Sequence, residues 1–212
     1  MIVQDDEEAR RRAAQVIAAG GVLAFRTDTF YGLGADPFNA GAVHRISELK
    51  GRDGKPILVV ISDTFQADRF ILNRSKLFEA VSERHWPGAL TLVVSARPEV
   101  PEELTAGSGT VGLRLPDNEA VRSFLRDCGG ALTATSANLA GEQPARNAAE
   151  VARSFPGGLD LIVDGGEYQG DQPSTVLDVS GEQVRLIREG AISRSDLQKT
   201  LRDIGVSIKE FV

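Results

Sequence analysis

The sequence predicts an α/β protein in which a mixed sheet of parallel and antiparallel strands is flanked by helices. Segments with strand character and segments with helix character alternate along most of the chain, and several strands follow one another towards the C-terminal end. The length of 212 residues suits one large domain with a sizeable core, and the sequence has no repeat, low-complexity tract or linker. We therefore expect one domain over residues 1–212.

The expected helices are recognised by the residues that cap and stop them. Acidic residues in the first turn favour the first helix, which Gly20-Gly21 ends. Asn39, Asp117 and Ser193 have side chains that can cap the helices following them. Pro87 disfavours helical backbone in the residue before it, so another helix is expected to end at residue 85. The predicted helices are 5–19, 39–50, 75–85, 117–127, 147–155 and 193–205.

The expected strands are short apolar runs that are rich in β-branched residues. Residues 57–61 are the clearest example, because Ile57-Leu58-Val59-Val60-Ile61 is almost entirely β-branched. Polar segments separate the runs, and we expect loops at 26–36, 98–109 and 136–146. The predicted strands are 22–25, 57–61, 90–94, 110–115, 131–135, 161–163, 175–179 and 184–187.

Composition excludes several classes of function. The formal net charge of −6 argues against a broad phosphate-backbone binder, which is usually basic, although it is compatible with a local basic pocket. Cys128 is the only cysteine, so neither an internal disulfide nor a cysteine-based zinc cluster can form. His44 and His85 are too few and too far apart to indicate a metal site. The apolar runs are too short to span a membrane, and we expect a cytoplasmic protein.

Polar residues that follow predicted strands are the first candidates for a binding site. Thr27-Asp28-Thr29-Phe30-Tyr31-Gly32-Leu33-Gly34 comes after one strand, and its glycines allow tight turns and a close approach of the main chain to a ligand. Thr135-Ser136-Ala137-Asn138 ends another strand and offers small hydrogen-bonding groups to a phosphate, a ribose or an adenine edge. Taken alone, each motif is more typical of an ordinary polar turn than of a binding site.

Cations gather just before the strand at residues 57–61. Lys50-Gly51-Arg52 and Lys55-Pro56 bring three positive charges within six positions. A triphosphate needs such charges, since Arg offers phosphate oxygens a planar fork and Lys a mobile point charge. The other interpretation is a basic last turn of a helix, which the helix dipole favours. Further along, Arg114 interrupts an apolar strand and faces either solvent or a pocket.

Common catalytic patterns are missing from the sequence. No Ser–His–Asp arrangement emerges, no Gly-Lys-Ser/Thr marks a Walker loop, and Gly32-Leu33-Gly34 lacks the third glycine of a dinucleotide fingerprint. We expect Trp86 to be a packing residue and Cys128 a small buried residue rather than a nucleophile. His44 is interpreted as a surface residue of a helix and His85 as a cation at a helix end.

Taken together and in this order, the motifs resemble the threonylcarbamoyl-AMP synthase family, whose members have the YrdC-like fold. The resemblance runs over about residues 10–195, nearly the whole chain. It implies a twisted open sheet with a large concave pocket, in the single-domain form of the family. The matching segments are residues 27–34, Lys50 and Arg52, Lys55-Pro56, Trp86-Pro87-Gly88, Arg114-Leu115-Pro116, Ser136-Ala137-Asn138, Pro173-Ser174-Thr175 and residues 188–192.

The resemblance also implies which residues bind which substrate. Lys50 and Arg52 are the implied catalytic residues, and Arg114 is the implied clamp for a carboxylate. The residues implied for ATP are Lys50, Arg52, Lys55, Thr110, Ser136, Asn138, Pro144 and Arg188. The residues implied for threonine are Thr29, Val60, Arg114, Ala134 and Ser174.

The implied reaction condenses L-threonine, bicarbonate or CO2, and ATP to threonylcarbamoyl-AMP and pyrophosphate. Mg2+ is expected to accompany the ATP, without a metal site of the protein's own. The product is expected to pass to a tRNA threonylcarbamoyl transferase complex, and direct contact with tRNA or double-stranded RNA is compatible with this role. Three alternatives stay open: a YrdC-like paralogue that binds a nucleotide or RNA without synthase activity, an RNA-binding module in ribosome maturation, and a carbamoyl-transfer domain.

Overall fold

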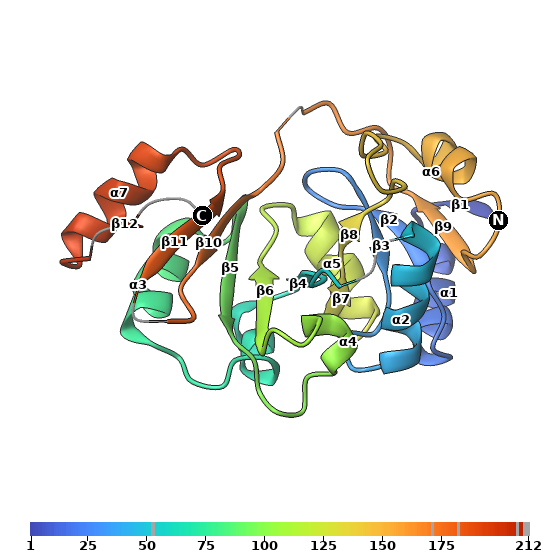
Figure 1. Ribbon diagram of the computed structural model, residues 1–212. Coiled ribbons are helices and arrows are strands. Elements are labelled where there is room, and N and C mark those ends of the chain that lie inside the picture. The colour runs from blue at the N-terminus through green and yellow to red at the C-terminus, as the bar shows by residue number, and fades with distance from the viewer. Residues whose placement is uncertain (52–53, 171, 182, 207, 210–212) are drawn as a thin grey trace.

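The computed structural model has an α/β fold in which helices flank mixed sheets, as the sequence predicts (Figure 1). It describes residues 1–51, 54–170, 172–181, 183–206 and 208–209. The described strands form two sheets, one of five strands and one of seven, instead of the one mixed sheet that we expected. In Figure 1 the five-stranded sheet lies to the right, near the N-terminus, and the seven-stranded sheet lies at the centre and left.

The helices begin at polar capping residues, mostly where the sequence predicts them. Asn39 and Ser193 are confirmed as caps, because their side chains accept hydrogen bonds from the main-chain N–H groups of Ala42 and Asp196. The cap expected at Asp117 is wrong, since Asn118 caps that helix instead. The helices are α1 (Glu7–Ala18), α2 (Ala40–Lys50), the 3-10 helix η1 (Thr64–Arg69), α3 (Lys76–His85), α4 (Glu102–Thr105), α5 (Glu119–Asp127), α6 (Ala148–Ser154) and α7 (Arg194–Asp203).

The five-stranded sheet is made of short strands from residues 2–34 and from residues 135–164. Its strands are β1 (Ile2–Gln4), β2 (Leu23–Arg26), β3 (Tyr31–Gly34), β8 (Thr135–Ser136) and β9 (Leu161–Asp164), in the order β1-β9-β2-β3-β8. β9 pairs in parallel with β1 and β2, whereas the β2–β3 and β3–β8 pairs are antiparallel. α1 and α6 both contact β2 and β9, and α5 contacts α1.

The seven-stranded sheet supplies most of the molecule's centre. Its strands are β4 (Val59–Ile61), β5 (Leu90–Ser95), β6 (Thr110–Arg114), β7 (Ala131–Thr133), β10 (Thr175–Asp178), β11 (Val184–Arg188) and β12 (Ile208–Lys209), in the order β12-β11-β10-β5-β6-β4-β7. Pairs β10–β5, β4–β6 and β11–β12 are parallel, and the others are antiparallel. α3 contacts β5 and α7, and η1 contacts β4.

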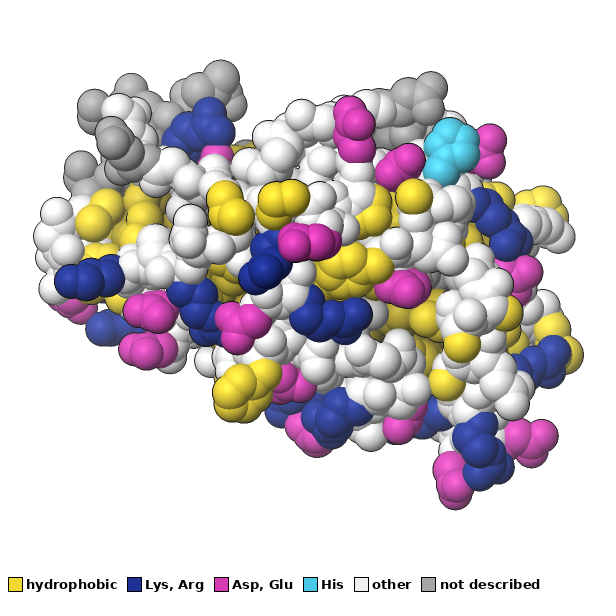
Figure 2. Space-filling model, turned by 90° about the horizontal axis from the view of Figure 1, so that it is seen from below, with side chains coloured by type: hydrophobic (Ala, Val, Ile, Leu, Met, Phe, Trp, Pro, Cys, Tyr) yellow, Lys and Arg dark blue, Asp and Glu magenta, His cyan; other side chains and the backbone are white. Residues whose placement is uncertain are grey.

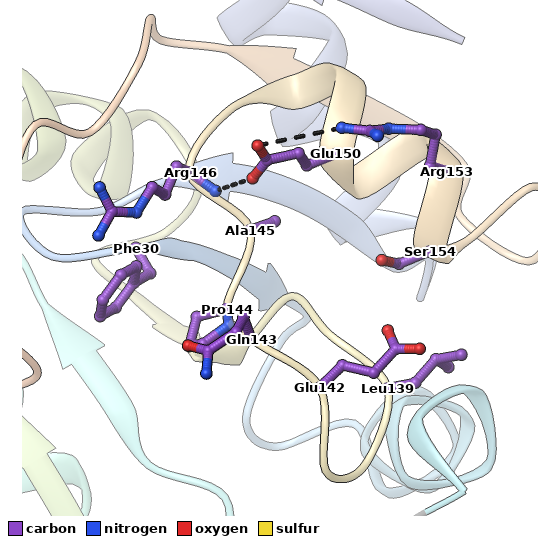
Figure 3. A pocket seen from close by; sticks show the side chains of 10 residues that line it. All are labelled: Phe30, Leu139, Glu142, Gln143, Pro144, Ala145, Arg146, Glu150, Arg153 and Ser154. Atoms are coloured by element: carbon purple, nitrogen blue, oxygen red, sulfur yellow. Dashed lines mark hydrogen bonds and ion pairs between the residues drawn. The ribbon is translucent and has the colours of Figure 1, made fainter. Parts of the chain in front are cut away.

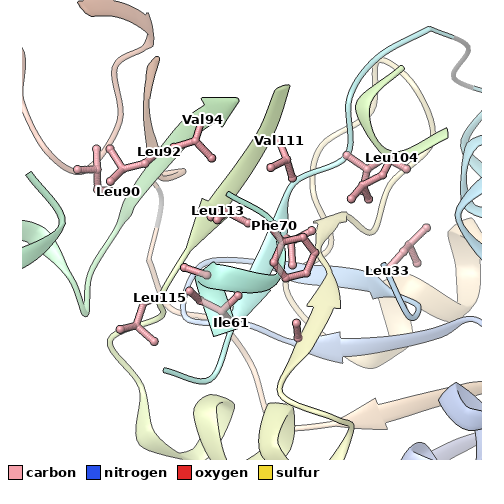
Figure 4. Packing of buried hydrophobic residues seen from close by; sticks show 14 of the residues in the cluster. Leu33, Ile61, Phe70, Leu90, Leu92, Val94, Leu104, Val111, Leu113 and Leu115 are labelled. Atoms are coloured by element: carbon pink, nitrogen blue, oxygen red, sulfur yellow. The ribbon is translucent and has the colours of Figure 1, made fainter. Parts of the chain in front are cut away.

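The two faces of the seven-stranded sheet differ, because side chains alternate along a strand. On one face alternate residues of β5 and β6 pack with Ile61 and Phe70 in one hydrophobic core, as Figure 4 shows. Residues of that core include Leu90, Leu92, Val94, Val111 and Leu113, and each is at most 3% exposed. The residues between them point to the opposite face, where the core does not fill the space.

The chain connects the two sheets where β7 ends and β8 begins. Thr133, which is fully buried, accepts a hydrogen bond from the N–H of Ala35 at 2.9 Å through its hydroxyl oxygen. The same hydroxyl donates to the carbonyl of Leu33 at 3.0 Å, and the Thr133 N–H donates to the Ala35 carbonyl. These bonds hold the end of β3 against the seven-stranded sheet, so the loop before β3 faces that sheet's polar side.

Candidate active site

A cavity of about 460 Å³ lies between the polar face of the seven-stranded sheet and the loop that joins β2 to β3. Its walls come from segments far apart in the sequence, including Pro56 to Leu58, Ser108, Pro144 and Pro173. Most of the predicted site residues lie here. The predicted residues that line the cavity are Thr29, Thr110, Arg114, Ala134, Ser136, Pro144, Ser174 and Arg188.

Alternate residues of neighbouring strands make the cavity floor. Thr91 of β5 is opposite Val176 of β10, which in turn is opposite Arg188 of β11, so these three form one row. All three line the cavity. Arg114 is the last residue of β6, and the residue before it, Leu113, is opposite Leu92 of β5. Arg114 therefore lies beside Thr91, at the β6 end of this row.

The next row of the floor is two residues further along β5, β6 and β10, and three residues along β11. It contains Gly112, Val93, Asp178 and Arg185, which are paired across β6, β5, β10 and β11. A side chain at Gly112 would reach to 3.3 Å from the Thr91 methyl group, so glycine keeps the middle of the floor open. Thr110 lies another row beyond.

A β-bulge directs Arg188 into the cavity. Arg188 is opposite Val176 while Leu186 is opposite Leu177, so one residue of β11, Ile187, has no partner. Without this extra residue, strict alternation would turn Arg188 to the same side as Leu186, which is in the core. The bulge therefore lets Arg185 and Arg188 face the same cavity from one strand.

Arg114 is almost completely buried and forms an ion pair in the cavity wall. Its Nη1 donates to Asp28 Oδ1 at 2.5 Å, and the two side chains are only 3% and 9% exposed. Its Nη2 lies 3.4 Å from the Thr29 hydroxyl, and its buried Nε has no hydrogen-bond partner among the described residues. Thr27 shapes this loop, since its hydroxyl donates to the Phe30 carbonyl and accepts from the Thr29 N–H.

Arg188 is held by hydrogen bonds without a carboxylate partner among the described residues. Its Nε and Nη2 donate to the Ser174 carbonyl at 3.1 and 2.8 Å, and Nη2 also lies 3.2 Å from the Ser174 hydroxyl. That hydroxyl is 3.0 Å from the hydroxyl of Thr91. Burial, together with the nearby charge of Arg114, lowers the pKa of Arg188, although a guanidinium stays protonated at any ordinary pH. The two guanidiniums are thus close enough to repel each other.

Gly190 fixes the position of Ser174. A side-chain carbon at Gly190 would come within 2.2 Å of the Pro173 carbonyl oxygen and 2.8 Å of the Ser174 carbonyl carbon, so only glycine fits. This close approach lets the buried Thr175 hydroxyl accept hydrogen bonds from the N–H groups of Gly190 and Ile192. The motif after β11 therefore orients the residue that holds Arg188.

Lys50 differs from the mobile cation that the sequence suggested. It is 4% exposed and is not among the cavity-lining residues. Its ammonium group donates to the main-chain carbonyls of Ser136 and Asn138, the latter at 2.7 Å. Lys50 thus joins the end of α2 to the loop after β8. Asn138 donates to the carbonyls of Leu139 and Glu142, and its buried Oδ1 has no partner among the described residues.

Among the other described residues predicted for the site, Lys55, Val60 and Asn138 are not in the cavity lining. Lys55 lines a different hollow, beside α2 and α4, and its role in binding ATP stays a prediction. Val60 is fully buried in the hydrophobic cluster under α5, while its neighbour Leu58 lines the cavity. Arg52 lies outside the described residues.

Sequence reasoning missed two charged residues of the cavity, Asp178 and Arg185. Arg185 Nη2 donates to Asp178 Oδ2 at 2.5 Å, and Nε donates to the same oxygen at 3.2 Å. Burial raises the pKa of Asp178, but hydrogen bonds from Ser180 and Arg185 outweigh it, so its pKa lies below the ordinary value. The alternation of β10 could have indicated Asp178, because a carboxylate in an apolar strand is as unusual as Arg114 in β6.

A second hollow adjoins the cavity. Phe30 and Pro144 line both, and its volume is about 720 Å³. Figure 3 shows Arg146 and Arg153 on either side of Glu150 there, with Glu142 on the far side of Pro144. Glu150 accepts a hydrogen bond from the Arg146 N–H at 2.7 Å. Cations and carboxylates balance in this hollow, so it has no strong preference for an anion.

The other residues that the sequence singled out, Trp86, Cys128, His44 and His85, lie outside the cavity lining. Trp86 is buried, as predicted, and packs edge-on against Phe78. Cys128 is buried as well, and burial raises the pKa of its thiol to about 12, which makes it a poor nucleophile. His44 is exposed on α2, whereas the interpretation of His85 as a cation is wrong, because burial and Arg84 lower its pKa and its Nε2 contacts the Thr200 hydroxyl at 2.9 Å.

Among the described residues, no three Asp, Glu, His or Cys side chains come together as a group able to hold a metal ion. Similarly, no helix in the described part of the chain combines the length and apolar character needed to cross a bilayer.

Two mixed sheets enclose a cavity that is lined by arginines, hydroxyls and main-chain groups. The fold and the cavity therefore define a protein of the class that binds small anionic molecules. The family model for Sua5, YciO and YrdC proteins, described as "Telomere recombination", matches residues 15–190. The chain belongs to this family, which confirms the resemblance seen in the motifs.

Curated relatives and solved structures agree with this assignment. The threonylcarbamoyl-AMP synthase of Bacillus subtilis is 35% identical over 92% of this chain, and that of Thiobacillus denitrificans is 40% identical over 76% of it. The crystal structure of Pyrococcus abyssi Sua5 complexed with L-threonine has a TM-score of 0.89 and 33% identity over 99% of this chain. The chain spans 57% of the length of the B. subtilis protein, 86% of the T. denitrificans protein and 61% of the P. abyssi chain.

Proposed function

We propose that the chain is an L-threonylcarbamoyladenylate synthase, which condenses L-threonine, bicarbonate or CO2, and ATP. The main support for this proposal is that motifs far apart in the sequence, from Thr29 to Arg188, contribute residues to one cavity. Relatives over most of this chain are named threonylcarbamoyl-AMP synthase, and a structural relative is described in complex with L-threonine. Both facts favour the synthase over a paralogue without activity.

Threonine would bind at the Arg114 end of the floor. The Arg114 guanidinium matches a carboxylate, and its buried Nε has no partner among the described residues. The hydroxyl of Thr29 lies 3.4 Å from Arg114 Nη2, and the hydroxyl of Ser174 lies 3.2 Å from Arg188 Nη2. These groups can orient the amino acid, whose neutral amine forms a carbamate by adding CO2 and losing a proton, or by reacting with bicarbonate and losing water.

The nucleotide would bind beside Arg188, with Ser136, Pro144 and the Asn138 loop as the site for its nucleoside part. One carbamate oxygen attacks the α-phosphorus, a new P–O bond forms, and the bond to pyrophosphate breaks. No protein nucleophile is required. The protein must instead align two anions that repel each other, and Arg188 can neutralise charge on the α-phosphate oxygens.

Lys50 and Arg52 are proposed as catalytic residues in different ways. Lys50 ties α2 to the loop that contains Ser136, so it can act by positioning that loop as well as by its charge. Arg52 would add a second cation from the same segment. Mg2+ would come with the triphosphate and reduce its negative charge, since the described residues include no cluster of metal ligands.

The reaction is tested by measuring pyrophosphate release from ATP with and without threonine and bicarbonate. Release that requires both additions is the expected result, and ATP consumption independent of threonine would contradict the proposal. Arg52→Ala should abolish release without changing the thermal unfolding midpoint, because Arg52 is predicted to lie in a polar segment. Normal release by this variant would remove Arg52 from the mechanism.

The product would pass to a tRNA threonylcarbamoyl transferase complex in the cytoplasm. An RNA-binding role without synthesis is the alternative, and it needs an extended basic surface. The face shown in Figure 2 has Lys and Arg interspersed with Asp and Glu, which disfavours RNA binding on that face. Binding to tRNA that weakens steeply with salt, without threonine-dependent ATP consumption, would favour the alternative.

A further inference from the structure

Arg185 is a third guanidinium in the cavity, and neither the sequence motifs nor the proposed chemistry gives it a role. It lines the cavity one row further along the floor than Arg188, because its partner on β10 is Asp178 while the partner of Arg188 is Val176. Two residues along a strand span about 6.7 Å, so the rows are separated by roughly that distance. The separation of the two rows is comparable to the distance from the α-phosphorus of a triphosphate to its outer phosphates.

The Arg185 side chain is held in one orientation by Asp178. Its Nε and Nη2 donate to Asp178 Oδ2, while Asp178 Oδ1 accepts from the N–H and the hydroxyl of Ser180 at 2.9 and 2.6 Å. Both carboxylate oxygens are therefore engaged. The Asp178 side chain is 5% exposed and that of Arg185 is 54% exposed.

The outer edge of this guanidinium is available to a ligand. No bond from Nη1 of Arg185 to the described residues is present, so its two protons can be donated to an acceptor in the cavity. A fork that is already fixed loses little side-chain entropy when it binds. Further donors line the same end of the cavity, namely the hydroxyls of Thr110 and Ser108, which are 2.9 Å apart.

The in-line geometry of the reaction predicts where the leaving pyrophosphate lies relative to the attacking carbamate. If threonine is at Arg114 and the α-phosphate at Arg188, as proposed above, the attacking carbamate approaches from the Arg114 side. The leaving group must then depart on the opposite side of the phosphorus. Arg185 is on the same strand as Arg188 and one row further along the floor, so it lies farther from Arg114 than Arg188 does.

We propose that Arg185, positioned by Asp178, binds the outer phosphates of the nucleotide and the pyrophosphate that leaves. The inference rests on the proposed function and adds a binding residue to it. Because Asp178 neutralises the pair, Arg185 contributes directed hydrogen bonds more than net charge. A hydrogen bond to a charged group is worth about 1.5–3 kcal/mol, and partial exposure favours the low end, which corresponds to about a tenfold change in affinity.

The test compares three ligands on one variant. Arg185→Gln and the unmodified protein are titrated with ATP, pyrophosphate and AMP by calorimetry, each with Mg2+ at fixed ionic strength. We expect about tenfold weaker binding of ATP and pyrophosphate and unchanged binding of AMP, which has no outer phosphates. Arg84→Gln is the matched control, because Arg84 also pairs with a carboxylate, Asp203 at 3.1 Å, but does not line the cavity.

Two results would overturn this inference while leaving the synthase proposal intact. One is ATP and pyrophosphate affinity in Arg185→Gln equal to that of the control. The other is an equal loss of AMP affinity with an unchanged unfolding midpoint, which would mean that Arg185 shapes the whole nucleotide site. If the unmodified protein bound neither AMP nor ATP, the proposed function itself would fail, and the inference with it.

Discussion

The ion pair between Asp28 and Arg114 offers the clearest test of how the cavity is stabilised. Both side chains are nearly inaccessible, at 9% and 3% exposure, and the charged atoms are 2.5 Å apart. Asp28→Asn removes the negative charge and leaves a buried guanidinium without compensation. Breaking one partner of a buried pair costs about 3–5 kcal/mol.

We expect the lower end of this range, because asparagine keeps one oxygen that can accept a hydrogen bond from Arg114. In a chain of this length, a loss of 1 kcal/mol lowers the unfolding midpoint by about 2–4 °C. A loss of about 3 kcal/mol therefore predicts a midpoint lowered by roughly 6–12 °C. Differential scanning calorimetry measures this directly at pH 7.

Asp203→Asn is the matched control, since Asp203 pairs with Arg84 on the surface and both side chains are more than half exposed. Exposed pairs contribute about 1 kcal/mol or less. Arg114→Gln combined with Asp28→Asn should cost less than the sum of the single variants, because the double variant has no unpaired buried charge. Equal midpoints for Asp28→Asn and Asp203→Asn would refute the reasoning.

Two further predictions concern the scaffold around the cavity. Burial and Arg84 lower the pKa of His85 in the folded state, so the unfolded state binds a proton at this residue more readily. The free energy of unfolding is therefore highest above about pH 6.5 and decreases as the pH falls below that value. His85→Gln should flatten this decline between pH 7.5 and 5 in chemical denaturation, whereas His44→Gln, on an exposed helix face, should leave it unchanged. Gly190→Ala forces a side chain against the main chain of Ser174, so we expect it to lower the free energy of unfolding by about 1–3 kcal/mol and to weaken ATP binding in calorimetry. Gly157→Ala is the control, because open space surrounds Gly157, and it should change neither quantity. Wild-type ATP affinity in Gly190→Ala would contradict the role given to this glycine.

Local signals predicted the longer helices, because the information lies within a few residues of each end, whereas the short η1 and α4 were missed. Asn39 and Ser193 cap their helices through the N–H groups three residues later, and both caps were readable from the sequence. Asp117 and Asn118 are adjacent and are both good caps, so the sequence alone could not choose between them. The expected strand at residues 57–61 is shorter in the structure and covers Val59–Ile61.

Strands that depend on distant partners were missed. β1 is three residues long and pairs with β9, about 160 positions away. β3 falls within the expected loop 26–36, because Gly32 and Gly34 resemble turn residues. In the structure a side chain at Gly34 would come within 2.9 Å of the Phe25 ring, and one at Gly32 within 3.4 Å of Ala134. These glycines allow close packing within a sheet, which no local pattern reveals.

The sequence predicted the site residues that belong to a motif, but not those that enter the site only because of how two strands pair. The motifs indicated Arg114, Ser174 and Arg188, which the structure brings together in the cavity. Arg185 belongs to no motif, and it shares a face with Arg188 only because of the bulge at Ile187. Bulges depend on how two strands pair, so the sequence of β11 alone could not predict this arrangement.

The arrangement of charges explains how an acidic chain can hold an anion site. The chain has a net charge of −6, yet Arg114, Arg185 and Arg188 all line one cavity. Three bare guanidiniums would repel one another, and the lowered pKa of Arg188, due to burial and to Arg114, reflects that cost. Asp28 and Asp178 neutralise the outer two and fix their orientation. Arg188 in the middle, which has no carboxylate partner among the described residues, therefore provides the strongest positive field, at the position proposed for the phosphate that is attacked.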